Sequence, residues 1–88
     1  MKIKNNNILK QIGNDYVIIP LDDTTSDLDK VFKINKVGVE IYNLLQEDIT
    51  FNALIDKLLE LYSVDKDVLI SDVDKFINKL KDKGLLDV

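Results

Sequence analysis

The fold of this chain is decided by residues 35–86, NKVGVEIYNLLQEDITFNALIDKLLELYSVDKDVLISDVDKFINKLKDKGLL. Three stretches with apolar residues at helical spacing follow one another here with short connections, and the last ends at Lys83-Gly84-Leu85-Leu86. Two or three short strand-like runs precede them. Strands followed by a close set of three helices indicate a small α+β domain with a winged-helix-like layout.

Each expected helix has a residue suited to its start. Asn35 is the expected N-cap of a helix over about 36–46, Thr50 caps the second helix, and the third begins near Asp65. The expected inner faces are Val37, Ile41, Leu44 and Leu45 in the first helix, and Leu54, Ile55, Leu58, Leu61 and Tyr62 in the second.

The third helix carries the widest apolar face, an arc of about 120°. Its members are Leu69, Ile70, Val73, Phe76, Ile77 and Leu80. Gly84 stands where a left-handed residue ends a helix, and Leu85 can pack back on Leu80. In the first helix Gly38 has two interpretations: it costs roughly 1 kcal/mol relative to Ala, or it permits a close approach.

The strands are expected ahead of the helices. Residues 8–12 and 15–21 predict two strands joined at the turn pair Gly13-Asn14. A polar linker follows over 22–27, and its acidic residues lack the ligand spacing of a calcium loop. Residues 30–34 alternate in polarity and predict a third strand with the character of a sheet edge.

The composition excludes several classes of function. The 88 residues predict one domain, 1–88, with no cysteine, histidine or arginine, so the commonest catalytic bases, thiolate metal sites and bidentate phosphate forks are absent. We therefore expect no enzyme, no metal and no cofactor. The net charge of −4 gives no long-range attraction to nucleic acid, and no apolar run is long enough to span a bilayer. The lack of cysteine fits a cytoplasmic protein.

Specific residues within this layout resemble a known family. They are Phe32-Lys33-Ile34-Asn35, the helix end Leu44-Leu45, Thr50 with the helix after it, and the pattern Asp72-Val73, Phe76-Ile77, Leu80, Gly84-Leu85-Leu86. Together these resemble the pyrroloquinoline quinone biosynthesis protein D (PqqD) type, the recognition element for precursor peptides of ribosomal natural products. The likeness extends over about Ile8 to Leu86.

The resemblance implies three antiparallel strands against a three-helix bundle. It also implies a non-catalytic role: binding the leader segment of a precursor peptide and presenting it to a modifying enzyme, often a radical SAM enzyme. In that family the leader adds as a strand to the edge of the third strand, beside the third helix. The residues that this places at the site are Val31, Phe32, Lys33, Ile34, Leu69, Asp72, Val73, Phe76, Lys79 and Lys83.

Several alternatives remain open at this point. Lys33 could be a plain deterrent to edge pairing or a contact for acidic leader residues. Asp72 could be a solvated charge or an acceptor at the groove. Either margin of the third helix could face the sheet, and we favour the one with Phe76. A winged-helix nucleic-acid binder is a rival function, but residues 65–83 carry five acids against five lysines. A groove for another protein partner is a further possibility.

Overall fold

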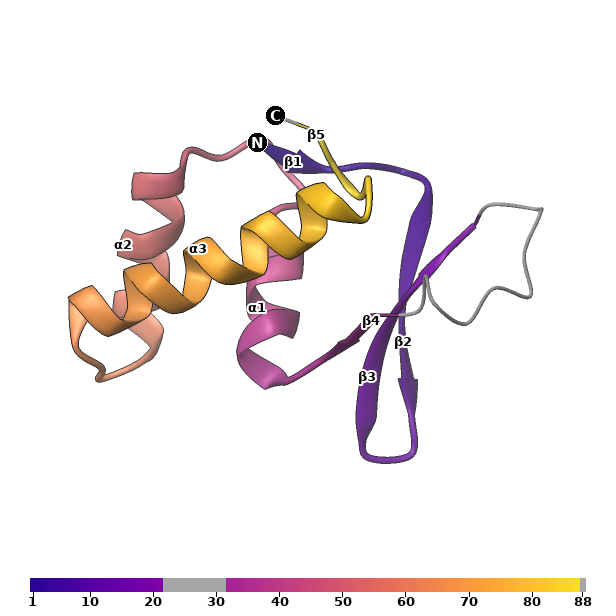
Figure 1. Ribbon diagram of the computed structural model, residues 1–88. Coiled ribbons are helices and arrows are strands. Elements are labelled where there is room, and N and C mark those ends of the chain that lie inside the picture. The colour runs from indigo at the N-terminus through magenta and orange to yellow at the C-terminus, as the bar shows by residue number, and fades with distance from the viewer. Residues whose placement is uncertain (22–31, 88) are drawn as a thin grey trace.

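A computed structural model describes residues 1–21 and 32–87 of the chain (Figure 1). The elements in chain order are β1 (Lys2–Ile3), β2 (Asn7–Ile12), β3 (Asp15–Pro20), β4 (Phe32–Ile34), α1 (Lys36–Leu44), α2 (Phe51–Leu61), α3 (Lys66–Asp82) and β5 (Leu86–Asp87). Strands β2, β3 and β4 form an antiparallel sheet in that order. The predicted α+β fold, with a three-stranded antiparallel sheet and three helices, is confirmed.

The sheet is organised around the predicted hairpin. Ile12 pairs with Asp15 across the two-residue turn, and Gly13 has a φ of 62°, which a glycine adopts without steric cost. The third strand is seen from Phe32 to Ile34. Its predicted first residues, Lys30 and Val31, and the predicted polar linker over 22–27 lie outside the described residues.

All three predicted helix caps are confirmed by side-chain hydrogen bonds. The Oδ1 atom of Asn35 accepts from Gly38 N at 2.9 Å, and the Oγ1 atom of Thr50 accepts from Ala53 N at 3.1 Å. The carboxylate of Asp65 accepts from two amides of the first turn of α3. These bonds satisfy amide groups that have no partner within the helix, and so they fix where each helix begins.

The ends of α1 and α3 differ in how well the sequence located them. Helix α1 ends at Leu44, two residues before the predicted Gln46, because Leu45 caps it and Gln46 N bonds to Asn43 O three residues back. The helix end at Leu44-Leu45 that the resemblance rests on is confirmed. The predicted end of α3 is confirmed. Gly84 has a φ of 70°, and the N–H of Leu85 donates to Leu80 O at 2.9 Å, the pattern of a Schellman motif.

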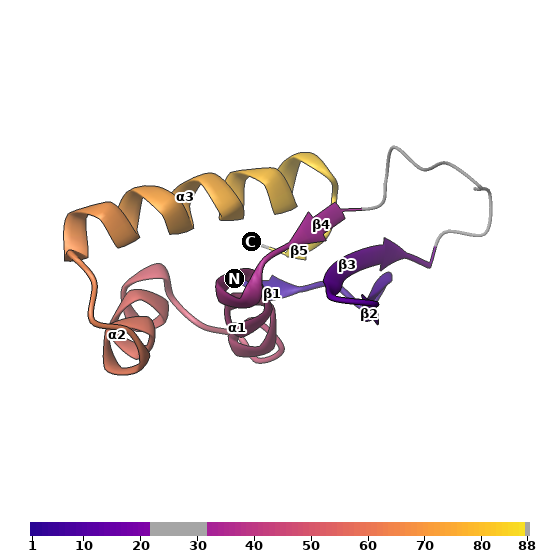
Figure 2. The same cartoon turned by 90° about the horizontal axis from the view of Figure 1, so that it is seen from below.

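The chain after this motif returns to the sequence start. The two residues of β5 pair with β1, a contact that the sequence did not predict. Figure 1 shows the N-terminal and C-terminal strands side by side at the end of α3. Figure 2 shows α3 lying across α1 and α2, with β4 leading from the sheet into α1.

The core lies between the helices and the inner face of the sheet. Its most deeply buried side chains are Ile18, Leu45, Leu54, Ile55, Leu58, Val73, Leu80 and Leu85. One member of the predicted inner face of α2 is wrong: Leu61 is 58% exposed. It is the last residue of α2, and the chain leaves the helix in an extended conformation at Tyr62, so Leu58 is the last buried position of that face. No described helix combines the length and the apolar composition that crossing a bilayer requires.

Candidate binding groove

A groove of about 210 Å³ lies between β4 and the middle of α3. It is lined by Phe32, Lys33, Ile34, Asn35, Asp72, Lys75, Phe76 and Lys79. The structure thus brings together residues that the sequence placed at the site on two separate elements. Lys75 was not predicted, because it is charged and lies outside the apolar arc of α3. Val31, which was predicted, lies outside the described residues.

Two stacked aromatic rings join the two walls of the groove. The ring centroids of Phe32 and Phe76 are 5.6 Å apart with an interplanar angle of 26°. The Nζ atom of Lys83 lies 5.4 Å from the centroid of Phe32, within the range of a cation–π contact. The favoured margin of α3 therefore faces β4, whereas Ile70 on the other margin lies near Asn52 and Ile55 of α2.

Gly38 allows α1, β4 and α3 to meet at the end of the groove. A Cβ atom at this position would lie 2.9 Å from the Cβ of Ile34 and 3.3 Å from Cε1 of Phe76. Cβ atoms in proteins essentially never approach as closely as the first of these distances. Of the two interpretations of Gly38, the structure supports the close approach.

The hydrogen-bonding direction of β4 follows from the register of the hairpin. Leu21 N donates to Asn6 O at 2.7 Å, which makes these two residues a bonded pair. Bonded and non-bonded pairs alternate along an antiparallel ladder. Counting back from Leu21, the residues of β3 that bond to β2 are therefore Ile19, Val17 and Asp15. The residues between them bond to β4.

Lys33 consequently directs its main-chain groups to the open side of the sheet. The β3 residues that bond to β4 are Tyr16 and Ile18, which pair with Ile34 and Phe32. Between these two pairs, the N–H and C=O of Lys33 point away from β3. In the described part of the chain, β4 has β3 as its only neighbouring strand. One donor and one acceptor are thus available for a further strand.

The side chain of Lys33 leaves this edge unobstructed. Phe32 and Ile34 are buried on the inner face, and the alternation of a strand places Lys33 on the outer face. Its Nζ lies 3.4 Å from Oδ1 of Asp15, and both side chains are more than half exposed. The ammonium therefore sits over the sheet beside β3.

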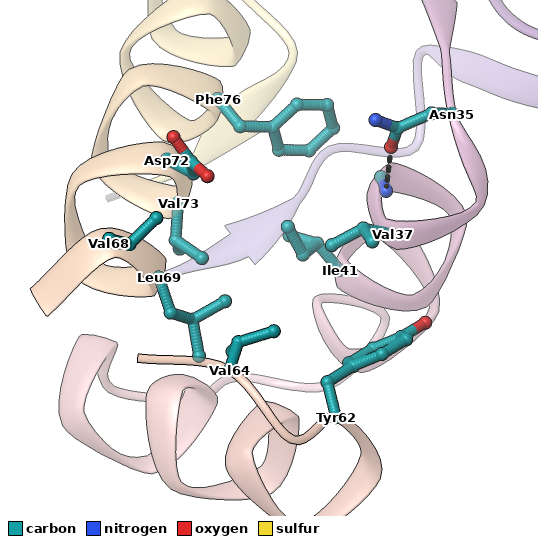
Figure 3. Close-up of a pocket in the computed structure, with 11 residues that line it drawn as sticks. Asn35, Val37, Ile41, Tyr62, Val64, Val68, Leu69, Asp72, Val73 and Phe76 are labelled. Carbon is teal, nitrogen blue, oxygen red and sulfur yellow. Dashed lines mark hydrogen bonds between the residues drawn. The ribbon is translucent and has the colours of Figure 1, made fainter. Parts of the chain in front are cut away.

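A second, larger cavity continues the groove between α1 and α3. It measures about 450 Å³ and shares Asn35, Asp72 and Phe76 with the first. Its other lining residues are Val37, Gly38, Ile41, Tyr62, Val64, Val68, Leu69 and Val73. Figure 3 shows Asp72 and Phe76 on one side of this cavity and Asn35 and Val37 on the other.

The predicted residues Leu69 and Val73 form part of the apolar lining of this cavity and are buried. Sequence reasoning missed the contributions of Tyr62, Val64 and Val68. Val64 and Val68 are 48% and 57% exposed and line the same cavity, and exposed apolar side chains that lie together mark an interaction surface. Val64 precedes α3 and Val68 lies in its first turn, and their spacing of four residues is a signal that could have marked an apolar surface.

The residues of the groove are suited to binding an extended peptide. Within residues 1–21 and 32–87, no group of acidic residues is arranged to hold a metal ion. The whole sequence has no histidine or cysteine that could act as a base or a nucleophile. What the groove offers is an open strand edge, an aromatic wall, lysines and an apolar cavity.

These features describe a small α+β protein with a groove between a sheet edge and a helix. The family model for coenzyme PQQ synthesis protein D (PqqD) matches residues 15–86, and the chain belongs to this family. A solved structure, "TbiB1 in Complex with the TbiA(beta) Leader Peptide", is similar over 99% of this chain and 95% of that one. The TM-score is 0.76 and the sequence identity is 29%. A comparison with curated proteins found no match. The predicted resemblance is confirmed.

Proposed function

We propose that this chain binds the leader segment of a precursor peptide as an additional strand on β4 and presents it to a modifying enzyme. The observation that carries this proposal is the outward N–H and C=O of Lys33 beside the aromatic wall of α3. Strand addition obtains affinity from main-chain hydrogen bonds and specificity from pockets for alternate side chains. The groove supplies both.

The comparison with TbiB1 supports the same function. That protein was solved with a leader peptide, and its chain matches this one over nearly the full length. We assign no catalytic step to the chain itself, whose sequence lacks histidine, cysteine and arginine. The chemistry belongs in this proposal to the partner enzyme, for which a radical SAM enzyme is one candidate. We place both in the cytoplasm, with which the lack of cysteine agrees.

The nucleic-acid alternative has less support. Helix α3, which would be the recognition helix, carries acids and lysines in equal numbers within a chain of net charge −4. No described feature favours this function over peptide binding.

The test is an NMR titration of the labelled protein with the leader of the precursor peptide encoded beside its gene. We expect amide shifts concentrated on Phe32–Asn35 and on 69–83. Shifts confined to another surface, or none at high-micromolar peptide, would contradict strand addition to β4.

A substitution at Lys33 makes this test specific. Proline at an edge position removes a donor that faces solvent and is tolerated there. Lys33→Pro should therefore weaken peptide binding at least about tenfold, because the main-chain hydrogen bond from this N–H to the peptide is lost. Lys33→Gln keeps the N–H and should bind within about twofold of the wild type. Equal binding by both variants would show that the peptide does not pair with Lys33.

A further inference from the structure

Two lysines of α3 face the open edge of β4. Lys75 and Lys79 both line the groove, together with Lys33 and Phe76. Both side chains are exposed, and within the described part of the chain neither takes part in an ion pair. In a protein of net charge −4, these two ammonium groups make the wall opposite β4 locally positive.

The spacing of the two lysines matches the repeat of an extended peptide. Lys75 and Lys79 are four residues apart, which corresponds to about 6 Å along the helix. Alternate side chains of a β-strand are about 6.6 Å apart and point to the same side. A strand paired with Lys33 would present every second side chain towards α3. Two such side chains, at positions i and i+2, would each meet one lysine.

Asp72 fixes which end of the groove accepts negative charge. It lies one turn before Lys75 and lines both the groove and the larger cavity. A peptide carboxylate at this point would be repelled by Asp72. Beyond it the cavity is lined by apolar side chains, among them Val64, Val68 and Leu69. The groove is therefore positive along Lys75 and Lys79, and at Asp72 it leads into an apolar cavity.

The direction of the peptide follows from the direction of β4. Phe32 at the start of β4 lies near Lys83 at the end of α3, and Asn35 after its end lies beside Asp72. Strand β4 thus runs opposite to α3. All pairs of the sheet are antiparallel, and a further antiparallel strand would run from Asp72 towards Lys79.

On the basis of the function proposed above, we infer the chemistry of the peptide that this chain recognises. The peptide carries two carboxylates at positions i and i+2, which pair with Lys75 and Lys79. A large apolar side chain precedes them in the sequence and enters the cavity between α1 and α3. Lys75 and Lys79 are the residues that determine this specificity.

The experiment is a selection from a displayed library of random twelve-residue peptides, with the full chain as bait. The wild type should enrich peptides with Asp or Glu at alternate positions after an apolar residue. The double variant Lys75→Glu/Lys79→Glu should instead enrich Lys or Arg at the same positions. The matched control is Lys57→Glu/Lys66→Glu, which changes the net charge equally at exposed sites outside the groove, and it should keep the acidic preference.

One selected peptide is then compared with its amide version, in which both acids are replaced by Asn or Gln. The replacement should weaken binding roughly tenfold, as expected for two exposed ion pairs in one site. Peptides that shift the Lys33 amide but show no acidic preference would overturn this inference and leave strand addition standing. If none of the enriched peptides shifts the Lys33 amide, the proposed function is contradicted, and this inference with it.

Discussion

Phe32 and Phe76 stack across the groove with their ring centroids 5.6 Å apart, although one belongs to a sheet edge and the other to a helix. The contact holds α3 at a fixed distance from the strand that a peptide would pair with. Both rings also belong to the hydrophobic core or pack against it. The groove wall and the core are thus continuous.

This relationship predicts energetic coupling between the two rings. Stacked aromatic pairs contribute about 0.5–1.5 kcal/mol beyond the area they bury. In a double-mutant cycle of Phe32→Leu and Phe76→Leu, followed by urea unfolding, we expect a coupling free energy in that range. If the changes in the free energy of unfolding of the two single variants add up to that of the double variant within about 0.3 kcal/mol, the stack has no such role. The pair Ile8→Leu and Val68→Leu, two exposed positions on separate elements, serves as the additive control.

Gly38 gives a second prediction, in which the usual effect of alanine is reversed. In most helices Gly→Ala stabilises by about 1 kcal/mol. Here the new Cβ would lie 2.9 Å from the Cβ of Ile34. Every residue except glycine carries a Cβ, so a smaller side chain at position 34 would not remove the clash. Gly38→Ala should therefore destabilise the protein by about 1–3 kcal/mol in urea unfolding, because β4 and α1 must separate.

Ser71→Ala is a suitable control for Gly38→Ala. It introduces the same residue on the exposed face of α3 and should change the free energy of unfolding by less than about 0.5 kcal/mol. A stabilising Gly38→Ala would mean that the junction of α1, β4 and α3 is looser than the distances indicate.

The sequence predicted those parts of the fold that local chemistry determines. Asn35, Thr50 and Asp65 cap helices because a side-chain oxygen near an amide of the first turn is a short-range feature. Gly84 ends α3 for an equally local reason, its positive φ. Leu61 was predicted to be buried because helical spacing alone does not show where the end of a helix extends beyond the elements that pack against it.

The site was predicted less completely than the fold. The resemblance identified both walls, but Lys75 escaped notice because a lysine beside an apolar arc looks like any solvated charge. The apolar cavity depends on Tyr62 and Val64, which precede α3 and line the cavity only through tertiary packing. The pairing of β1 with β5 was missed since two-residue strands show no periodicity.

A buried hydrogen bond between β2 and α1 gives a third prediction. The hydroxyl of Tyr42 donates to Oδ1 of Asn7 at 2.8 Å, and both residues are buried. Tyr42→Phe leaves that oxygen without its donor, which should cost about 1–3 kcal/mol in urea unfolding. Tyr62→Phe, at a half-buried position of the cavity, should cost less than about 0.5 kcal/mol. Equal losses for the two variants would contradict the role given to this bond.

The same tyrosine predicts how stability depends on alkaline pH. Burial raises the pKa of the Tyr42 hydroxyl above its ordinary value. An unfolded tyrosine ionises near pH 10, so at higher pH the native state holds a proton that the unfolded state has released. The resulting stabilisation is fully present below about pH 10 and is lost as the pH rises through the native pKa of Tyr42.

Urea unfolding at a series of pH values between 8 and 11 measures this loss, if wild type and Tyr42→Phe are compared at each pH. All other side chains are common to both proteins, so their contributions cancel in the difference. We expect the stability advantage of the wild type over Tyr42→Phe to shrink at the alkaline end of the series. An advantage that is constant with pH would show that the hydroxyl ionises equally easily in the folded and unfolded chain.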